Sequence, residues 1–394
     1  MKILLVNKFY YPRGGDCTAV MSTEELLRAK GHQVAIFSVK HPENVASPFQ
    51  DYFPQEVDFF NSGLAGKLSG AKRIFYSSEV ARLFKRLLTD FQPDVVHLHN
   101  IHSYLSPIVA QIAHKQGIKV VWTLHDYKLI CPAYTCLRDG KPCELCFKSK
   151  FQVVKRRCMK GSLPASILAY AEAVWWNRHK LEMITDTFIS PSNFLKDKML
   201  SAGFQSDKIT MLSNFMSHQP KAVLEKDDYY CYVGRLSEEK GIEMLLETAF
   251  ALPYPLKIIG NGTSLDTLRK RYNHPNIQFL GQMPHEQLFP IVGKARFAVV
   301  PSVWYENNPY SAIEALCMGT PVLGASIGGI PELVEEGVNG MTFEAGKKEE
   351  LAAKIHEMFR KPFNYSEIAL KAQTRFSADT FYTKLMNIYK KILM

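Results

Sequence analysis

The chain begins MKILLVNKFYYPRGGDCTAVMSTEELLRAKGHQVAIFSV, residues 1–39. Its first run, Lys2–Asn7, is rich in leucine and β-branched residues and predicts a buried strand. A glycine-bearing loop follows, and then a helical pattern that ends at Lys30. The next apolar run, Gln33–Val39, predicts a second strand. A strand, a helix and a strand in this order predict a βαβ unit, in which the two strands lie parallel in one sheet.

The same alternation continues to the end of the chain. Further strands are predicted at 94–99, 120–124, 187–190 and 208–212, and, after a polar segment at 216–227, at 229–233, 256–259, 277–280, 297–301 and 321–325. Helices are predicted between them, for example at 105–116, 193–202, 240–251, 264–272, 285–294, 309–318 and 349–360. The pattern predicts two doubly wound α/β domains in series, which bind ligands at the carboxyl ends of their strands.

The predicted domain boundaries follow this restart. The first domain covers residues 1–215 and contains a cysteine-rich insertion at about 131–160. The second covers 216–376, and an amphipathic helix occupies 377–394. The pattern leaves open whether this helix packs back on the first domain.

The composition is that of a globular protein, but its charge is unevenly distributed. Of 394 residues, 46% are hydrophobic and 22% charged, and the net charge is +10. Residues 1–220 hold 28 Lys and Arg against 18 Asp and Glu, whereas residues 221–394 hold 20 of each. A basic half favours nucleic acid, an anionic membrane surface or an acidic substrate as partner. Nucleic acid is disfavoured because no recognised nucleic-acid-binding module is present.

The cellular location is predicted from apolar runs and cysteines. No apolar run approaches the ~18 residues of a transmembrane helix. The apolar start is too short for a signal peptide. We therefore expect a cytoplasmic protein, in which the eight cysteines are thiols or metal ligands rather than a disulfide framework.

Two carboxylates flank a predicted helix start in the segment ENNPYSAIE, residues 306–314. Pro309 suits the first turn of a helix, because its missing N–H would be unpaired there. Glu306 then lies in the preceding loop and Glu314 on the helix. The free N–H groups near Asn308, Pro309 and Tyr310 would form an anion site between the two acids. A nucleotide sugar, which carries hydroxyls and phosphates, fits this arrangement, whereas two solvated acids at an ordinary helix start are the alternative.

A loop with two cations follows the first strand of the second domain. In GRLSEEKG, residues 234–241, Arg235 and Lys240 lie between Gly234 and a second glycine. Both cations would point into the crevice, where they could neutralise a diphosphate. The alternative is a solvated ion pair with Glu239.

Paired glycines follow three other strands. Gly14 and Gly15 precede the first helix, Gly260 and Gly262 follow a second-domain strand, and Gly328 and Gly329 open a late helix. Such glycines let backbone N–H groups approach a phosphate closely, although each pair could be a plain tight turn. The spaced GxGxxG fingerprint is absent, which disfavours a nicotinamide cofactor.

Together these motifs resemble the retaining glycosyltransferases of family 4. The resemblance rests on GR…KG at 234–241, the E-x7-E pair at 306 and 314, GTPV at 319–322 and GGIPE at 328–332, with Gly14-Gly15 and TLHD at 123–126 in the first domain. It spans nearly the whole chain. The family has the GT-B fold, in which two Rossmann-like domains face each other across a cleft.

The resemblance implies a role for each residue. Glu314 would bind the ribose hydroxyls of a UDP or GDP sugar, and Arg235 and Lys240 would hold the diphosphate. Glu306 and the N–H groups at 308–310 would hold the hydroxyls of the donor sugar. His125 would face that sugar, and Gly15 would touch the diphosphate or leave room for the acceptor. The family commonly has Phe-Gly after the first Glu, where this chain has Asn-Asn-Pro at 307–309.

The resemblance also implies the reaction. A hexose-type sugar would move, with retention of anomeric configuration, to a hydroxyl of a glycan or lipid-linked acceptor in cell-surface polysaccharide or glycolipid assembly. Front-face attack requires no cofactor and no side-chain nucleophile. A covalent intermediate on Glu306 is an alternative mechanism. A catalytically silent nucleotide- or carbohydrate-binding protein and a nucleotide-sugar epimerase are alternative functions.

Two further groups of residues carry predictions. His125 could instead be structural or, with His97 and His99, belong to a metal site. Cys131, Cys143, Cys146 and Cys158 have the spacing of a structural four-thiolate zinc site, with free thiols or disulfides as alternatives.

A basic and aromatic segment follows the cysteines. It carries Lys148, Lys150, Lys155, Arg156, Arg157 and Lys160, and then Tyr170, Trp175 and Trp176. Cations beside aromatic rings favour an interface with anionic lipid at the inner face of a membrane. The alternative is a core helix with a solvated basic flank.

Overall fold

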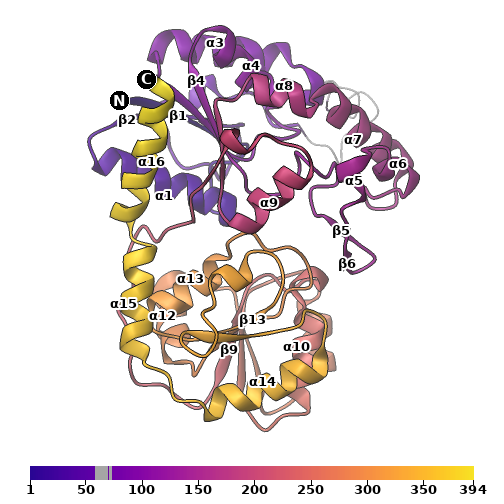
Figure 1. Cartoon of the computed structure of the whole chain (residues 1–394), viewed down its shortest axis with the longest axis vertical. Coiled ribbons are helices and arrows are strands. Elements are labelled where there is room, and N and C mark those ends of the chain that lie inside the picture. The colour runs from indigo at the N-terminus through magenta and orange to yellow at the C-terminus, as the bar shows by residue number, and fades with distance from the viewer. Residues whose placement is uncertain (58–69, 71–72) are drawn as a thin grey trace. The chain divides into compact units, whose positions relative to one another are not determined.

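The computed structural model describes residues 1–57, 70 and 73–394, and within this range the chain folds into two compact units (Figure 1). The first comprises Met1–Cys136, Cys143–Ser213 and Phe381–Met394. The second comprises Leu137–Pro142 and Asn214–Thr380. In the described part of the chain, no helix combines the length and the apolar character needed to cross a membrane.

The first unit is built on a six-stranded parallel sheet with the order β2-β1-β3-β4-β7-β8. Its strands are β1 (Lys2–Val6), β2 (Gln33–Phe37), β3 (Val95–Leu98), β4 (Lys119–Thr123), β7 (Thr187–Ser190) and β8 (Ile209–Met211). Its helices include α1 (Gly15–Ala29), α3 (Ser78–Phe91), α4 (Ile108–Lys115), α5 (Leu145–Lys148), α6 (Gln152–Lys155), α7 (Leu163–Trp175), α8 (Arg178–Met183) and α9 (Asn193–Ser201).

The last helix, α16 (Ala378–Leu393), contributes to the core of the first unit. Leu385 and Tyr389 are fully buried there against residues of β1 and β2 (Figure 1). The Tyr389 hydroxyl is 2.6 Å from His97 Nδ1 on β3. The apolar stripe of this amphipathic helix is therefore covered by the first sheet.

The second unit repeats the architecture with the order β11-β10-β9-β12-β13-β14, again all parallel. Its strands are β9 (Tyr230–Val233), β10 (Leu256–Ile259), β11 (Ile277–Gly281), β12 (Ala298–Val300), β13 (Val322–Ala325) and β14 (Gly340–Phe343). Its helices are α10 (Ile242–Phe250), α11 (Leu265–Arg271), α12 (His285–Lys294), α13 (Tyr310–Cys317), α14 (Lys348–Arg360) and α15 (Tyr365–Arg375).

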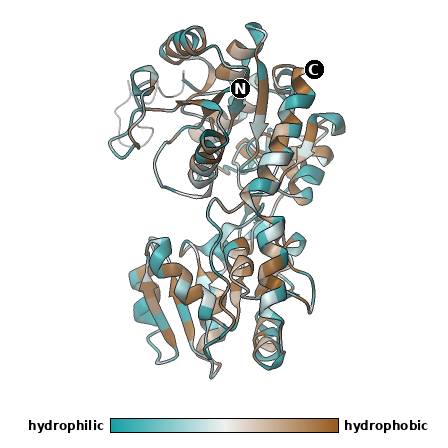
Figure 2. Cartoon of the chain, turned by 90° about the vertical axis from the view of Figure 1, so that its left-hand side faces the viewer, coloured by the Kyte–Doolittle hydropathy of each residue, from teal (hydrophilic) through white to brown (hydrophobic). Residues whose placement is uncertain are grey.

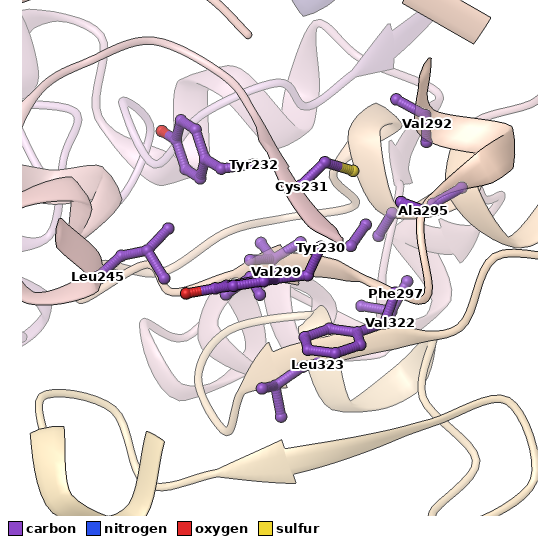
Figure 3. Packing of buried hydrophobic residues seen from close by; sticks show 14 of the residues in the cluster. Tyr230, Cys231, Tyr232, Leu245, Val292, Ala295, Phe297, Val299, Val322 and Leu323 are labelled. Carbon is purple, nitrogen blue, oxygen red and sulfur yellow. The ribbon is translucent and has the colours of Figure 1, made fainter. Parts of the chain in front are cut away.

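Packing in the second unit follows the apolar strands. Figure 2 shows the hydrophobic residues concentrated on strands and the hydrophilic residues on surface helices and loops. In Figure 3, Tyr230 lies beside Phe297, and their ring centroids are 5.2 Å apart. Burial of such strands on both faces explains their continuous apolar runs.

The prediction of two doubly wound α/β units is confirmed, and each predicted strand is present within a residue or two at either end. The prediction lacked β14 and the short hairpin of β5 (Leu137–Arg138) and β6 (Lys141–Pro142). β14 begins with glycine and is only four residues long, so it carries a weak strand signal.

Candidate active site

The predicted donor-site residues of the second unit lie in loops that follow β9, β10, β12 and β13. These four strands are neighbours in one parallel sheet. Because parallel strands end on the same side, the four loops share the carboxyl edge of the sheet, where doubly wound folds bind ligands.

Glu306 is the centre of a buried polar cluster at this edge. Its Oε1 accepts hydrogen bonds from Lys240 Nζ and Ser302 Oγ, each at 2.6 Å, and from Trp304 Nε1 at 2.9 Å. The side chain is 8% exposed. Burial disfavours the charged form, but the Lys240 charge and the three donors outweigh it and lower the pKa of Glu306. The carboxylate is therefore ionised and held in one position.

The loop of Gly328 and Gly329 supports the backbone of Glu306. Gly329 N donates to Glu306 O at 2.6 Å. Gly328 has a φ of +63°, and a Cβ there would lie 2.3 Å from Glu306 O and 2.5 Å from Glu306 N. Only glycine combines that conformation with so close an approach. Gly328 and Gly329 are thus in contact with the backbone of Glu306, next to its carboxylate.

The two predicted glycines after β10 are also in close contact with backbone. A Cβ on Gly260 would lie 1.9 Å from Gly234 O, and one on Gly262 would lie 2.3 Å from Leu236 O. A Cβ on Gly234 itself would meet the Tyr232 hydroxyl at 3.0 Å. The loops after β9 and β10 are therefore packed directly on each other, which places Arg235 and Lys240.

The two cations of the first loop have different partners. Lys240 is 22% exposed and pairs with Glu306, which joins the loop after β9 to the loop after β12. Arg235 is 60% exposed and pairs with Glu239. The ion pair with Glu239, considered above as an alternative, is present for Arg235. Because the Arg235 side chain is mostly exposed, this pair contributes little to stability and the guanidinium is accessible.

Glu314 is buried on α13. Burial raises the pKa of Glu314 to about 7. Its Oε1 lies 3.6 Å from His285 Nε2. The nearby Tyr310 hydroxyl is buried and has no hydrogen-bond partner among the described residues. A carboxyl group of this kind can accept a hydrogen bond when ionised and donate one when protonated.

Asn308 has a structural partner. Asn214 N donates to Asn308 Oδ1 at 2.9 Å, and Asn214 Nδ2 donates to Asn308 O at 2.8 Å. Pro309 is the N-cap of α13. Asn308 therefore connects the start of α13 to Asn214, the first residue of the segment Asn214–Thr380 of the second unit.

The first unit brings polar residues to the carboxyl edge of its own sheet. His125 follows β4, and its Nε2 is hydrogen bonded to His99 Nδ1 at 2.9 Å. Asn100 Nδ2 donates to Asp16 Oδ2 at 3.1 Å. Burial lowers the pKa of His125 to about 4, against the opposing effect of the Asp16 charge. The His125 imidazole is therefore neutral at neutral pH.

Gly14 and Gly15 lie at the start of α1, beside this group. Gly14 is the N-cap with extended backbone, and Gly15 is the first residue of the helix. Both are exposed. A Cβ at Gly14 would meet only Asp16 Oδ1, at 3.6 Å. Gly14 is therefore not required by internal packing, in contrast to Gly328.

His97, considered above as a possible metal ligand, has both ring nitrogens in hydrogen bonds. His97 uses Nδ1 for the Tyr389 hydroxyl and Nε2 for Thr123 Oγ1, at 2.6 and 2.7 Å. Among residues 1–57, 70 and 73–394, no group of three or more His, Cys, Asp or Glu side chains that could hold a metal ion is found. His97 is thus a structural histidine.

The thiols of the cysteine-rich insertion influence one another. Interactions with the thiols of Cys136 and Cys146 lower the pKa of Cys131. Cys136 is absent from the predicted set, which includes Cys143. All eight cysteines are free thiols, so the disulfide alternative is not realised in this structure.

A structural zinc ion in this insertion stays a prediction. Elemental analysis of freshly purified protein should find about one zinc per chain if four thiolates bind it. Cys143→Ser should then release the metal if the spacing identifies the ligands, whereas Cys136→Ser should release it if the thiol contacts do. Metal-free wild-type protein would refute the zinc prediction.

Sequence reasoning missed several residues of these clusters. Ser302 and Trp304 complete the environment of Glu306, while Asp16 and Asn100 lie near His125 together with His99, which the sequence suggested only as a metal ligand. Each follows a strand or starts a helix at the carboxyl edge of its sheet. Their position directly after a strand or at a helix start is the signal that could have identified them. Their residue types and spacing match no motif.

Two family models match the chain in succession. The model described as Glycosyltransferase Family 4 matches residues 14–219, and the model of glycosyl transferases group 1 matches residues 215–376. An uncharacterized 42.6 kDa protein in the cps region of Klebsiella pneumoniae is 28% identical, over 84% of this chain and 87% of its own length. Glycogen synthase of Mycobacterium tuberculosis is 27% identical, over 96% of this chain and 91% of the synthase.

Solved structures agree on the fold. HepE of Anabaena, determined in complex with UDP-glucose, superposes with a TM-score of 0.66 at 18% identity, over 99% of this chain and all of HepE. This likeness shows the GT-B fold of two Rossmann-like units. With family models covering residues 14 to 376 without a break, the chain belongs to glycosyltransferase family 4.

Proposed function

We propose that this glycosyltransferase moves a sugar from a nucleoside diphosphate sugar to an acceptor hydroxyl with retention of anomeric configuration. The buried cluster of Lys240, Ser302 and Trp304 around Glu306 carries the proposal. A buried carboxylate with one oxygen committed to three donors is oriented for recognition of a ligand hydroxyl by its other oxygen. The family supplies the class of donor.

The cations would act on the leaving group. Cleavage of the glycosyl–phosphate bond builds negative charge on the diphosphate. Arg235 and Lys240, together with the N-terminal N–H groups of α13, would stabilise that charge where it grows. Arg235 could exchange Glu239 for a phosphate, because its own side chain is 60% exposed.

Glu306 would position the sugar and not attack it. Three hydrogen bonds to Glu306 Oε1 hold the carboxylate in place and leave its other oxygen to bind a hydroxyl of the donor sugar. Its lowered pKa also makes it a weak base. Attack by the acceptor on the same face as the departing phosphate, with the phosphate taking the acceptor proton, fits such a site. His125, neutral and hydrogen bonded to His99, would donate a hydrogen bond to the sugar.

The acceptor is proposed to be a glycan or a lipid-linked glycan in polysaccharide or glycolipid assembly. The relative in a cps region and the glycogen synthase support this reading. The HepE complex supports a UDP-linked donor. A silent binding protein would release no nucleoside diphosphate, and an epimerase would release none that depends on an acceptor.

Two assays test the proposal. Thermal stabilisation by one member of a panel of UDP, GDP and ADP sugars would identify the donor, because a ligand that binds only the folded state raises its stability. Incubation of that donor with candidate acceptors should then release free nucleoside diphosphate. Release independent of acceptor, or no release with any acceptor, would contradict transfer.

Because of the raised pKa of Glu314, we expect its substitution by glutamine to affect nucleotide binding and protein stability in opposite directions. Its folded pKa of about 7 lies above the ordinary glutamate value of 4.5, so ionisation on raising the pH through this window opposes folding. Glu314→Gln should therefore stabilise the protein at pH 8, on the order of 2 kcal/mol, while weakening nucleotide binding about tenfold or more through loss of a ribose contact.

Thermal unfolding and calorimetric titration, each at pH 5 and pH 8, measure these two effects. At pH 5 the stability of the variant should match that of the wild type, because Glu314 is then protonated. A variant that loses stability at pH 8, or binds nucleotide as well as the wild type, would contradict the assignment.

A further inference from the structure

The outward face of α7 is apolar. Leu163, Ile167 and Val174 are 40%, 49% and 49% exposed. With about 100° between successive residues of a helix, they fall within about 40° of one another. The inward face carries the buried Ser166, Ala169 and Glu172 instead. The alternative of a core helix is therefore wrong, because α7 turns its larger apolar side chains toward solvent.

Neighbouring elements extend this apolar stripe. Phe151, 52% exposed, packs edge-on against Tyr170, with ring centroids 5.6 Å apart. Trp175 at the end of α7 is 53% exposed. Figure 1 shows α5, α6 and α7 together in the first unit. We call this surface the α7 face, and its exposed apolar residues are Phe151, Leu163, Ile167, Val174 and Trp175.

The exposed charged side chains in the segments that lead into α7 are positive. Lys148, Lys155, Arg157 and Lys160 are exposed in the segments that lead into α7. From 145 to 183, all of which is described, the sequence holds only two acidic residues, and both are buried. Glu172 pairs with Lys128 at 2.7 Å, and Glu182 accepts a hydrogen bond from Gln205 N. The exposed surface is therefore apolar and cationic.

We propose that the α7 face docks on the surface of an anionic lipid bilayer. Aromatic and aliphatic side chains can enter the headgroup region, while the lysines and arginines remain beside the lipid phosphates. A second copy of the chain fits less well, because two such faces would oppose like charges. A nucleic acid would leave the apolar stripe without a partner. The proposal does not depend on the proposed transfer reaction.

The docked helix would be coupled to the His125 loop. Glu172, on the inward face of α7, pairs with Lys128, and Lys128 N donates to Asp126 Oδ1 at 2.8 Å. Asp126 directly follows His125. One ion pair and one backbone-to-side-chain hydrogen bond thus connect α7 to the residue after His125. If the proposed function holds, this is a suitable location for an acceptor anchored in lipid.

Sedimentation with vesicles tests the proposal on the full-length protein. The wild type should sediment with phosphatidylglycerol–phosphatidylcholine vesicles at low salt, bind much less at high salt, and remain in solution with phosphatidylcholine alone. Ile167→Glu with Val174→Glu, and separately Arg157→Gln with Lys160→Gln, should each weaken the partition on the order of tenfold.

Matched controls use exposed residues of the second unit. Leu370→Glu and Lys270→Gln, at an exposed leucine and an exposed lysine of that unit, should leave vesicle binding unchanged. Thermal unfolding checks that all variants remain folded. Binding that the α7-face variants do not weaken, or no binding at low salt, overturns the proposal. A dimer in sedimentation velocity that Ile167→Glu dissociates would assign the face to self-association instead and also overturn it.

Discussion

Replacing Lys240 with methionine is expected to lower kcat on the order of a thousandfold, because the variant loses the cation proposed to stabilise the leaving diphosphate. It should also lower the free energy of unfolding by about 3 kcal/mol or more, since Glu306 would remain buried without its charged partner. Initial rates at saturating donor and chemical denaturation measure the two effects.

A second substitution separates the two effects. Lys240→Met combined with Glu306→Gln removes the uncompensated buried charge, so it should regain most of the lost stability without regaining activity. Lys270→Met, at an exposed lysine of the same unit, serves as control and should retain both. A Lys240→Met enzyme with near wild-type kcat would refute the assigned role of this lysine.

Alanine at Gly328 is expected to disable the site without removing any polar group. The new Cβ would lie 2.3 Å from Glu306 O and 2.5 Å from Glu306 N, at a φ of +63°. The loop must therefore shift and displace Glu306. A shift of about 1 Å at a reacting group can cost on the order of a hundredfold in rate. For Gly328→Ala we expect kcat to fall on the order of a hundredfold and the free energy of unfolding to fall by about 3 kcal/mol.

Gly346→Ala is the matched control. Gly346 has a φ of +82°, but a Cβ there would meet no atom within 4 Å. It should cost only the ~1–2 kcal/mol of a left-handed backbone and leave kcat unchanged. Equal effects of the two substitutions would show that backbone conformation alone matters and that the contact with Glu306 does not.

Much of the fold could be predicted because its signals are local. Strands such as β1 and β9 are continuous apolar runs, and βα alternation predicts parallel sheets. β14 was missed since four residues that begin with glycine give no run. The contribution of α16 to the first core was not predictable, because the pairing of Tyr389 with His97 joins residues 292 positions apart.

Spacing in the sequence predicted which candidate-site residues share a loop, but not which of them are in contact. The spacing of Glu306 and Glu314 pointed to one helix start, and the cations to one loop. That Lys240 pairs with Glu306 while Arg235 pairs with Glu239 depends on how two loops pack, which spacing does not encode. The glycines were expected to admit a ligand, yet Gly328 and Gly260 are in contact with backbone.

The central claim is retaining transfer from a nucleoside diphosphate sugar by a site organised around Glu306. Its most direct test follows the reaction by NMR with the donor selected by thermal stabilisation, reading the anomeric configuration of the product at the earliest times. We predict acceptor-dependent release of nucleoside diphosphate and a product with the configuration of the donor, and loss of both in Glu306→Gln. An inverted product, or full activity of Glu306→Gln, would contradict the account.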